Sequence, residues 1–375
     1  MSARLAPLKY FCMKKFYWFF SLFFCLGSLA QTPRVEDLLS FTKPAFNPIL
    51  KADTSLLFFD SLKKETVRWQ RADVFNPAAI VRKGKVYLFT RSEDNPAAGI
   101  GGRTSRIGLA VSKDGLHFKH YKKPVLYPRQ DAFMQYDYPG GCEDPRVVET
   151  EDGQYVMAYT SWNYKIPRLS VAISKDLFNW EKKGPAFAAA YAGKYLDKAS
   201  KSASMITTMK NGRPVLNKIN GKYWMYWGEA FVNLAWSTNL YDWYPMQDAS
   251  GELTKVIQTR PGKFDSDLTE CGPPALQTQE GILLLYNGKN AGNENADSQL
   301  PKNTYTVGYV LLDIKDMQTV IRRADTPILK PTLSHEVTGQ YKAGTIFSEG
   351  LVFFKRKWFL YYGTADSFVG AAVSK

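Results

Sequence analysis

"GQYVMAYTSW" (residues 153–162) and "RLSVAISKDLFNW" (168–180) follow one another closely near the middle of the chain. Each is a short run rich in apolar and aromatic residues, and such runs are typical of β-strands. The "SKDL" in the second run contains a serine and an aspartate, whose side chains hydrogen-bond to their own backbone in tight turns. This stretch therefore predicts two neighbouring strands, the second of which ends in a turn.

The same two-strand pattern occurs five times. The other pairs lie at 84–91 with 106–118, 221–230 with 232–243, 281–290 with 306–314, and 356–365 with 368–375. Ser112, Ser174 and Ser237 recur about 62 residues apart, and repetition with such a period indicates an array of small sheets. Sheets of four strands arranged around an axis form a propeller. We therefore predict an all-β, single-domain, five-bladed β-propeller with a central funnel over residues 31–375, with short helices only near 33–40 and 190–205.

The first thirty residues have the layout of a signal peptide. A basic segment, "MSARLAPLKYFCMKK", precedes the apolar run "FYWFFSLFFCLGSLA". That run of about fifteen residues is shorter than the about 20 that a membrane-spanning helix needs. We expect residues 1–30 to be a signal peptide and the mature protein to be exported, either periplasmic or extracellular. An uncleaved anchor, a lipid anchor on Cys25 and a start at Met13 are the alternatives.

The composition limits the classes of partner. The net charge is +14, but the basic residues are scattered and form no nucleic-acid motif. We expect a basic, solvated surface, no nucleic-acid partner and no stable membrane insertion after leader removal. With three histidines and no metal-ligand spacing, the sequence predicts no zinc site and no cofactor. Cys142 and Cys271 lie beyond the leader, and their pairing and the oligomeric state are left open.

Paired acids stand in a constrained setting in "YPGGCEDPRVVE" (138–149). Pro145 restricts Asp144 to an extended conformation, so we expect Asp144 and Arg146 to share one side and Glu143 to pair elsewhere with an arginine. Two further acids, Glu229 and Glu270, lie near strand ends, where they can converge on the axis of a propeller. Two carboxylates flanking a sugar are what glycosidic cleavage requires, although a structural Asp–Arg ion pair would also explain the motif.

Several segments together resemble one enzyme family. "FTRSED" (89–94), "SRIGLAVSKDG" (105–115), "GGCEDPRV" (140–147), "CGPPAL" (271–276) and "FLYYGTAD" (359–366) occur in that order. They resemble glycoside hydrolase family 130, the β-mannoside phosphorylases and mannosidases, over most of residues 75–375. The resemblance implies a five-bladed propeller and an inverting reaction on a terminal β-mannosyl residue, with Asp144 as proton donor. The candidate substrate-binding residues are Arg91, Glu93, Arg146, Trp162, Arg168, Lys218 and Asp366.

One departure from the family pattern bears on the nucleophile. Phosphorolytic members place basic residues around the phosphate, including a lysine just before the Gly-Pro-Pro segment, whereas "TECGPP" places Glu270 there. A carboxylate repels phosphate and suits water. The resemblance therefore points to the exported hydrolytic branch, reported to act on β-1,2-mannosides. Asp144 would then be the general acid and Glu270, Glu229 or both the base, with the acid and base roughly 6.5–9.5 Å or more apart.

Three alternative functions are left open. The first is a phosphorylase whose phosphate site contains Lys201, Lys218 and Arg168. The second is a carbohydrate-binding propeller without catalysis, and the third is a neighbouring five-bladed glycosidase family that acts on arabinosides or xylosides. The glycine-rich "AAGIGGRTS" (97–105) lacks the ending of a phosphate-binding loop, and we interpret it as a loop near the funnel.

Overall fold

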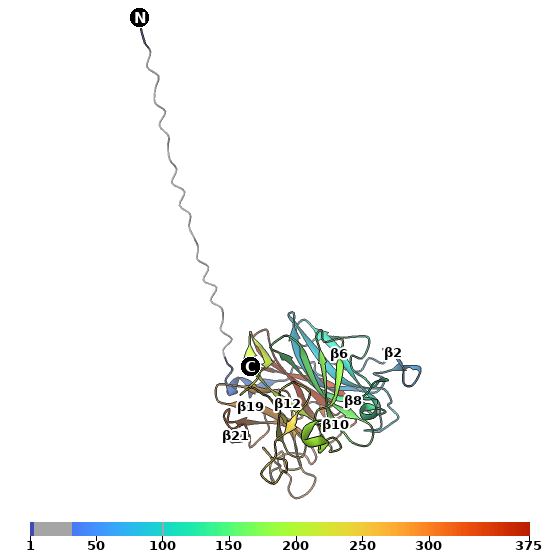
Figure 1. Ribbon diagram of the computed structural model, residues 1–375. Coiled ribbons are helices and arrows are strands. Elements are labelled where there is room, and N and C mark those ends of the chain that lie inside the picture. Colours follow the sequence, from blue (N-terminus) through green and yellow to red (C-terminus); the bar gives the residue numbers. More distant parts are fainter. Residues whose placement is uncertain (4–31, 100) are drawn as a thin grey trace.

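The computed structural model describes residues 1–3, 32–99 and 101–375 (Figure 1). These residues are mostly strands, so the all-β prediction is confirmed. Apart from its first three residues, the predicted signal peptide lies outside the described part of the chain. The short helices are η1 (Val35–Leu38), α1 (Met134–Asp137), η2 (Ala190–Gly193) and η3 (Ser334–Glu336). Two of them, η1 and η2, lie where short helices were expected. None of the described helices has the length and apolar character needed to cross a membrane.

The described strands form five successive antiparallel sets. Set 1 contains β4 (Val74–Arg82), β5 (Lys85–Glu93), β6 (Ser105–Ser112) and β7 (Phe118–His120). Set 2 contains β8 (Gly141–Thr150), β9 (Tyr155–Trp162), β10 (Arg168–Ser174) and β11 (Glu181–Pro185). Set 3 contains β12 (Ala203–Lys210), its hairpin partner β13 (Arg213–Leu216), β14 (Tyr223–Trp227), β15 (Asn233–Ser237) and β16 (Tyr244–Pro245).

The last two sets complete the series. Set 4 contains β17 (Leu268–Cys271), β18 (Ala275–Gln277), β19 (Ile282–Lys289), β20 (Tyr305–Leu312) and β21 (Val320–Arg323). Set 5 contains β22 (Ile346–Phe354), β23 (Lys357–Thr364), β24 (Phe368–Ser374) and β1 (Phe41–Thr42). The N-terminal strand β1 thus supplies the outer strand of the C-terminal set, with Phe41 opposite Ser374.

Each of the five predicted strand pairs corresponds to two adjacent strands of one set. They are β5 with β6, β9 with β10, β14 with β15, β19 with β20, and β23 with β24, each antiparallel. The repeated serine has the same role each time. Its hydroxyl accepts backbone N–H groups, as Ser174 does from Asp176 and Leu177 at 3.2 and 2.9 Å. Ser112 and Ser237 accept the equivalent bonds, which confirms the predicted turn chemistry.

Each hydrophobic cluster lies between two consecutive sets. Leu88 of β5 and Val352 of β22 belong to one cluster, so the last set packs against the first. The four remaining clusters join sets 1 and 2, 2 and 3, 3 and 4, and 4 and 5. Cys142 and Cys271 are buried in two different clusters and are not bonded to each other. Because each face of a set is covered by its neighbours, no set needs to be stable alone.

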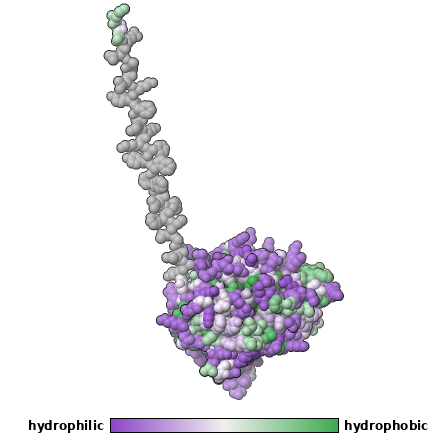
Figure 2. All heavy atoms as spheres, in the orientation of Figure 1, coloured by the Kyte–Doolittle hydropathy of each residue, from purple (hydrophilic) through white to green (hydrophobic). Residues whose placement is uncertain are grey.

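A hairpin of β2 (Leu57–Asp60) and β3 (Glu65–Arg68) projects from this body at the right of Figure 1. The wholly buried Arg106 pairs with Asp60 of β2 at 2.5 Å and anchors the hairpin to β6. Leu57 and Phe59 of β2 are exposed, and the surface in Figure 2 is apolar where the hairpin lies. Elsewhere the visible face is mostly hydrophilic, with small scattered apolar patches.

The first strands of three sets deviate from regular pleating close to one another. The pairing register shifts at Asn76 in β4, between Glu143 and Arg146 in β8, and at Glu349 in β22. Asn76 and Asp144 have positive φ values of 47° and 46°, which are uncommon for residues other than glycine. The expectation that Asp144 is extended is therefore wrong, because a β-bulge reorients its side chain.

Gly363 on β23 allows the bulge at Asn76, because a Cβ there would clash with the side chain and backbone nitrogen of Asn76. We expect Gly363→Ala to lower the free energy of unfolding by about 1–3 kcal/mol, the usual effect of overpacking. Chemical denaturation followed by circular dichroism measures this change. Gly99→Ala is the control, since its Cβ would meet nothing. Equal stability of the two variants would contradict the expectation.

Candidate active site

A cavity of about 290 Å³ collects side chains from every set or from the segments that join them. Its lining residues are Phe75, Asn76, Arg91, Glu93, Asp144, Lys201, Glu270, Tyr305, Gln340, Tyr341, Thr345, Phe347 and Asp366. Two of these side chains are cationic and four are acidic. Residues far apart in sequence thus converge on one polar cavity whose acids outnumber its bases.

Arg91 joins three carboxylates on one side of the cavity. Its Nη2 lies 2.8 Å from both Glu93 Oε1 and Glu143 Oε1, and its Nη1 lies 3.4 Å from Asp144 Oδ1. Glu143 pairs with an arginine as expected, but the expectation that it does so away from Asp144 is wrong, because the same Arg91 contacts both. Burial alone would lower the pKa of Arg91, but the three carboxylates raise it well above its ordinary value. Arg91 therefore stays charged and keeps the acids close together.

Asp144 is positioned by contacts to its side chain and its backbone. Asn76 Nδ2 donates a hydrogen bond of 2.9 Å to Asp144 Oδ1, and Arg146 Nη1 donates one of 2.9 Å to the Asp144 carbonyl. Burial works to raise the pKa of Asp144, but Arg91, Arg146 and Lys201 together lower it below its ordinary value. Asp144 therefore favours the ionised form.

A second group of charges lies on another side of the cavity. Glu270 is only 2% exposed and accepts a short hydrogen bond from the Ser202 hydroxyl. Lys201 Nζ lies 2.8 Å from Glu229 Oε2 and 3.8 Å from Glu270 Oε1. Burial raises the pKa of Glu270 although Lys201 opposes the shift. Glu270 is therefore a stronger base than an exposed glutamate. The positive charge of Lys201 is balanced by its two acidic neighbours.

The structure brings five of the candidate residues to the cavity itself: Arg91, Glu93, Asp144, Glu270 and Asp366. Burial raises the pKa of Asp366 to about 6, despite the nearby Arg91. Glu229 is half-exposed and reaches the cavity through Lys201. Arg146 is 1% exposed and lies beneath the cavity lining instead of in it, so it contacts the backbone of site residues.

Three other candidates lie away from the cavity lining. Arg168 Nη2 pairs with Asp197 at 2.6 Å, so the guanidinium of Arg168 is bound to a loop residue. Trp162 Nε1 donates to the Gly101 carbonyl at 3.0 Å and so fastens the glycine-rich loop. Lys218 lies over the Tyr223 ring, 5.2 Å from its centroid. In each case the side chain contacts a local partner. The residue type and the position in the strand pattern did not reveal these contacts.

Sequence reasoning missed the polar and aromatic residues that complete the lining. Tyr305 packs edge-on against Tyr341, with ring centroids 5.4 Å apart. Gln340 Nε2 donates to Glu93 Oε2 at 3.3 Å and to the Asp366 carbonyl at 2.7 Å, which ties two parts of the wall together. The segment around Gln340 lies outside the strands, so the repeat gave no signal for it.

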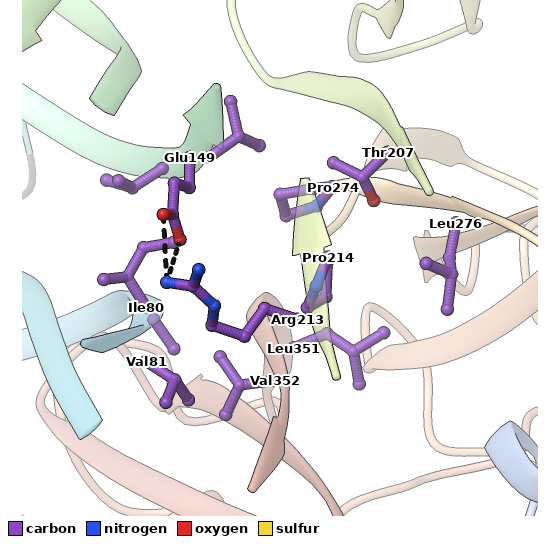
Figure 3. Close-up of a pocket in the computed structure, with 13 residues that line it drawn as sticks. Ile80, Val81, Glu149, Thr207, Arg213, Pro214, Pro274, Leu276, Leu351 and Val352 are labelled. Carbon is purple, nitrogen blue, oxygen red and sulfur yellow. Dashed lines mark hydrogen bonds and ion pairs between the residues drawn. The ribbon is translucent and has the colours of Figure 1, made fainter. Parts of the chain in front are cut away.

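The same strands line a second, much smaller cavity farther along their length (Figure 3). Its volume is about 20 Å³, and its walls are mainly aliphatic, with Ile80 and Val81 of β4 and Val352 of β22. Arg213 of β13 pairs with Glu149 of β8 at 2.7 Å across it. Aliphatic packing and this ion pair therefore fill the space at this end, and of these two cavities the larger one has the acids and the room for a sugar.

The pKa of Glu143 makes stability depend on pH. Burial raises it to about 7 from an ordinary 4.5. Between these values the folded protein keeps a proton that the unfolded chain has lost, so the free energy of unfolding falls as pH rises through this window. Glu143→Gln should flatten this fall in denaturation experiments from pH 4 to 8. The exposed Glu65→Gln is the control and should keep the wild-type slope; a wild-type slope in Glu143→Gln would contradict the expectation.

Comparisons with known proteins place this chain among mannoside-processing enzymes. A 1,2-beta-oligomannan phosphorylase of Thermoanaerobacter sp. (strain X514) is 33% identical over 316 residues, which are 83% of this chain and 93% of the relative. A glycosyl hydrolase structure from Bacteroides ovatus is 47% identical, with a TM-score of 0.87 and coverage of 89% of this chain and 93% of that one.

A further solved structure is 46% identical, with a TM-score of 0.87 and coverage of 93% and 95% of the two chains. Its description states that the GH130 family of mannoside phosphorylases contains glycoside hydrolases that target β-1,2 mannosidic linkages in Candida mannan. The family model described as beta-1,4-mannooligosaccharide phosphorylase matches residues 43–375. The chain therefore belongs to glycoside hydrolase family 130.

Proposed function

We propose that the protein is an inverting, exo-acting glycoside hydrolase that releases mannose from β-mannosides, in particular β-1,2-linked ones. The observation that carries the proposal is the acidic character of the cavity, in which Glu93, Asp144, Glu270 and Asp366 outnumber Arg91 and Lys201. A phosphate ion would meet like charges there. At an effective dielectric of about 20, two like charges 4 Å apart repel by about 4 kcal/mol, whereas water meets no such barrier.

Glu270 is the better candidate for the base that activates water. It lines the cavity and is almost fully buried, whereas Glu229 is half-exposed and lies outside the lining. A raised pKa makes a carboxylate a stronger base, and burial raises the pKa of Glu270. Glu229 then balances the positive charge of Lys201, which would otherwise attract phosphate.

Asp144 is the general acid in this proposal, and it needs a proton. Despite burial, Arg91, Arg146 and Lys201 lower the pKa of Asp144, whereas burial raises the pKa of its neighbour Glu143 to about 7. Since both carboxylates contact Arg91, they titrate as a pair, and the proton belongs to the pair. A bound sugar would also exclude water from Asp144, which raises the pKa of a carboxyl group.

The second candidate is a phosphorylase, which is what the curated relative is described to be. Lys201 favours it, because the lysine lies in the cavity. Its two acidic partners weigh against it, and so does the position of Arg168 and Lys218 away from the cavity lining. The more similar solved structure, whose description concerns hydrolases of β-1,2 linkages, also supports hydrolysis.

Two further parts of the proposal concern the fold and the location. The cyclic packing of five antiparallel sets supports a five-bladed propeller. The filled space at one end supports exo action, because only the end of a sugar chain can then enter the larger cavity. We also propose export after removal of residues 1–30 as a signal peptide. N-terminal sequencing of the protein from its native cells tests this last point.

Phosphate dependence decides between the two activities. With β-1,2-mannobiose, we expect free mannose at the same rate with and without phosphate, because the acidic wall excludes the anion. Chromatography of the products and NMR of the first-formed anomer measure this, and the inverting reaction gives α-mannose. β-1,4-Mannobiose is the control for linkage. Release of mannose 1-phosphate would overturn the proposal.

Isosteric substitutions separate the catalytic roles. We expect Asp144→Asn and Glu270→Gln each to lower kcat by about 10²–10⁴, the usual contribution of an acid or base, and Glu229→Gln to lower it less. A dinitrophenyl β-mannoside needs no acid, so Asp144→Asn should recover part of its activity on that substrate while Glu270→Gln should not. The exposed Asp325→Asn is the control. Wild-type kcat in Asp144→Asn would indicate a binding protein or another acid.

A further inference from the structure

A single guanidinium beneath the cavity contacts the backbone next to both proposed catalytic carboxylates. Arg146 Nη1 donates to the carbonyl of Asp144 at 2.9 Å, and Nη2 donates to the carbonyl of Cys271 at 3.0 Å. Cys271 directly follows Glu270. Because β8 and β17 belong to different sets, this arginine fixes the position of the acid relative to the base.

Arg146 is itself oriented by a buried acid that the proposed mechanism does not use. Glu349 Oε1 lies 3.0 Å from Arg146 Nη1. Glu349 is fully buried and does not line the cavity. Apart from this ion pair, neither of its oxygens has a hydrogen-bond partner among the described residues. A buried carboxylate with so little compensation is costly, so its presence calls for a reason.

The strand around Glu349 is built to place this side chain. Glu349 is the extra residue at the register shift in β22. Its neighbour Ser348 is clamped by Asn287 of β19, which accepts from the Ser348 backbone N–H at 2.8 Å and hydroxyl at 2.9 Å and donates to its carbonyl at 3.1 Å. On the other side, Gly350 lies so close to β4 that a Cβ would be 2.8 Å from the Pro77 carbonyl oxygen.

We propose that Glu349 is a positioning residue of the reaction, which orients Arg146 and thereby fixes the separation of Asp144 and Glu270. This inference rests on the catalytic roles proposed above. The strained backbone of Asp144, with its positive φ, needs such support, because an uncommon conformation persists only where its surroundings favour it. The bulges in β8 and β22 thus present the Asp144 carbonyl and the Glu349 carboxylate to the same guanidinium, that of Arg146.

The test compares Glu349→Gln with the double variant Arg146→Gln, Glu349→Gln, on β-1,2-mannobiose. Glu349→Gln removes the acid that pairs with Arg146, so we expect a lower melting temperature and a kcat lowered by about tenfold to a hundredfold, the effect of slight misplacement, with KM unchanged. The double variant has no isolated charge. We expect its melting temperature to recover but its kcat to stay low, since the two carbonyls have lost the guanidinium.

Glu336→Gln is the matched control. Glu336 is also fully buried and pairs with Lys43 at 2.7 Å, but its side chain does not line the cavity and does not contact Arg146. It should lose stability and keep the wild-type kcat. The positioning role is rejected if Glu349→Gln has wild-type kcat, if the double variant regains wild-type kcat along with its stability, or if neither variant folds, which would make the pair a folding element alone. Should Glu349→Gln alone fail to fold, the double variant decides.

The wild-type enzyme, assayed beside the variants with and without phosphate, reports on the proposed function separately. If it proves to use phosphate, the variants are measured in phosphate, and their kcat relative to the wild type still tests Glu349. Failure of hydrolysis and failure of the positioning role are therefore distinguishable.

Discussion

Two partly buried cations allow several carboxylates to lie close together at one cavity. Arg91 lies against Glu93, Glu143 and Asp144, and Lys201 lies between Glu229 and Glu270. Without these cations, like charges at such distances would repel strongly and take up protons. Burial and the cations instead drive the pKa values of neighbouring acids apart: that of Glu143 rises, while that of Asp144 falls. The acid–base chemistry proposed for the cavity depends on this separation.

The arrangement of the strands is as important as the charges. Regular pleating would send Glu143 and Asp144 to opposite faces, yet both reach Arg91 because β8 bulges at Asp144. The neighbouring bulge at Asn76 supplies the hydrogen bond that orients the Asp144 carboxylate. Local departures from sheet geometry therefore create the site, and the regular strands around them provide rigidity.

The sequence predicted the parts of the fold that carry a local signal. One adjacent strand pair in each set was found because its strands are apolar and aromatic, and in three sets a repeated serine turn follows the pair. The first strands were missed, since bulges and breaks such as Gly272 between β17 and β18 interrupt them, and β1 was missed because only tertiary pairing defines it. For the site, the sequence analysis found the acids that stand in stretches rich in glycine and proline. The positions of Trp162, Arg168 and Lys218 were not, because local partners that are invisible in the sequence occupy these side chains.

The pairing of β1 with β24 has a consequence for when the protein can fold. Set 5 is completed by residues from both ends of the domain, Phe41 and Thr42 beside Val373 and Ser374. Ribosomal synthesis delivers the N-terminal partner first, and it must wait for the last residues before its strand can pair. The ring of packed sheets can therefore close only after β24 has been synthesised.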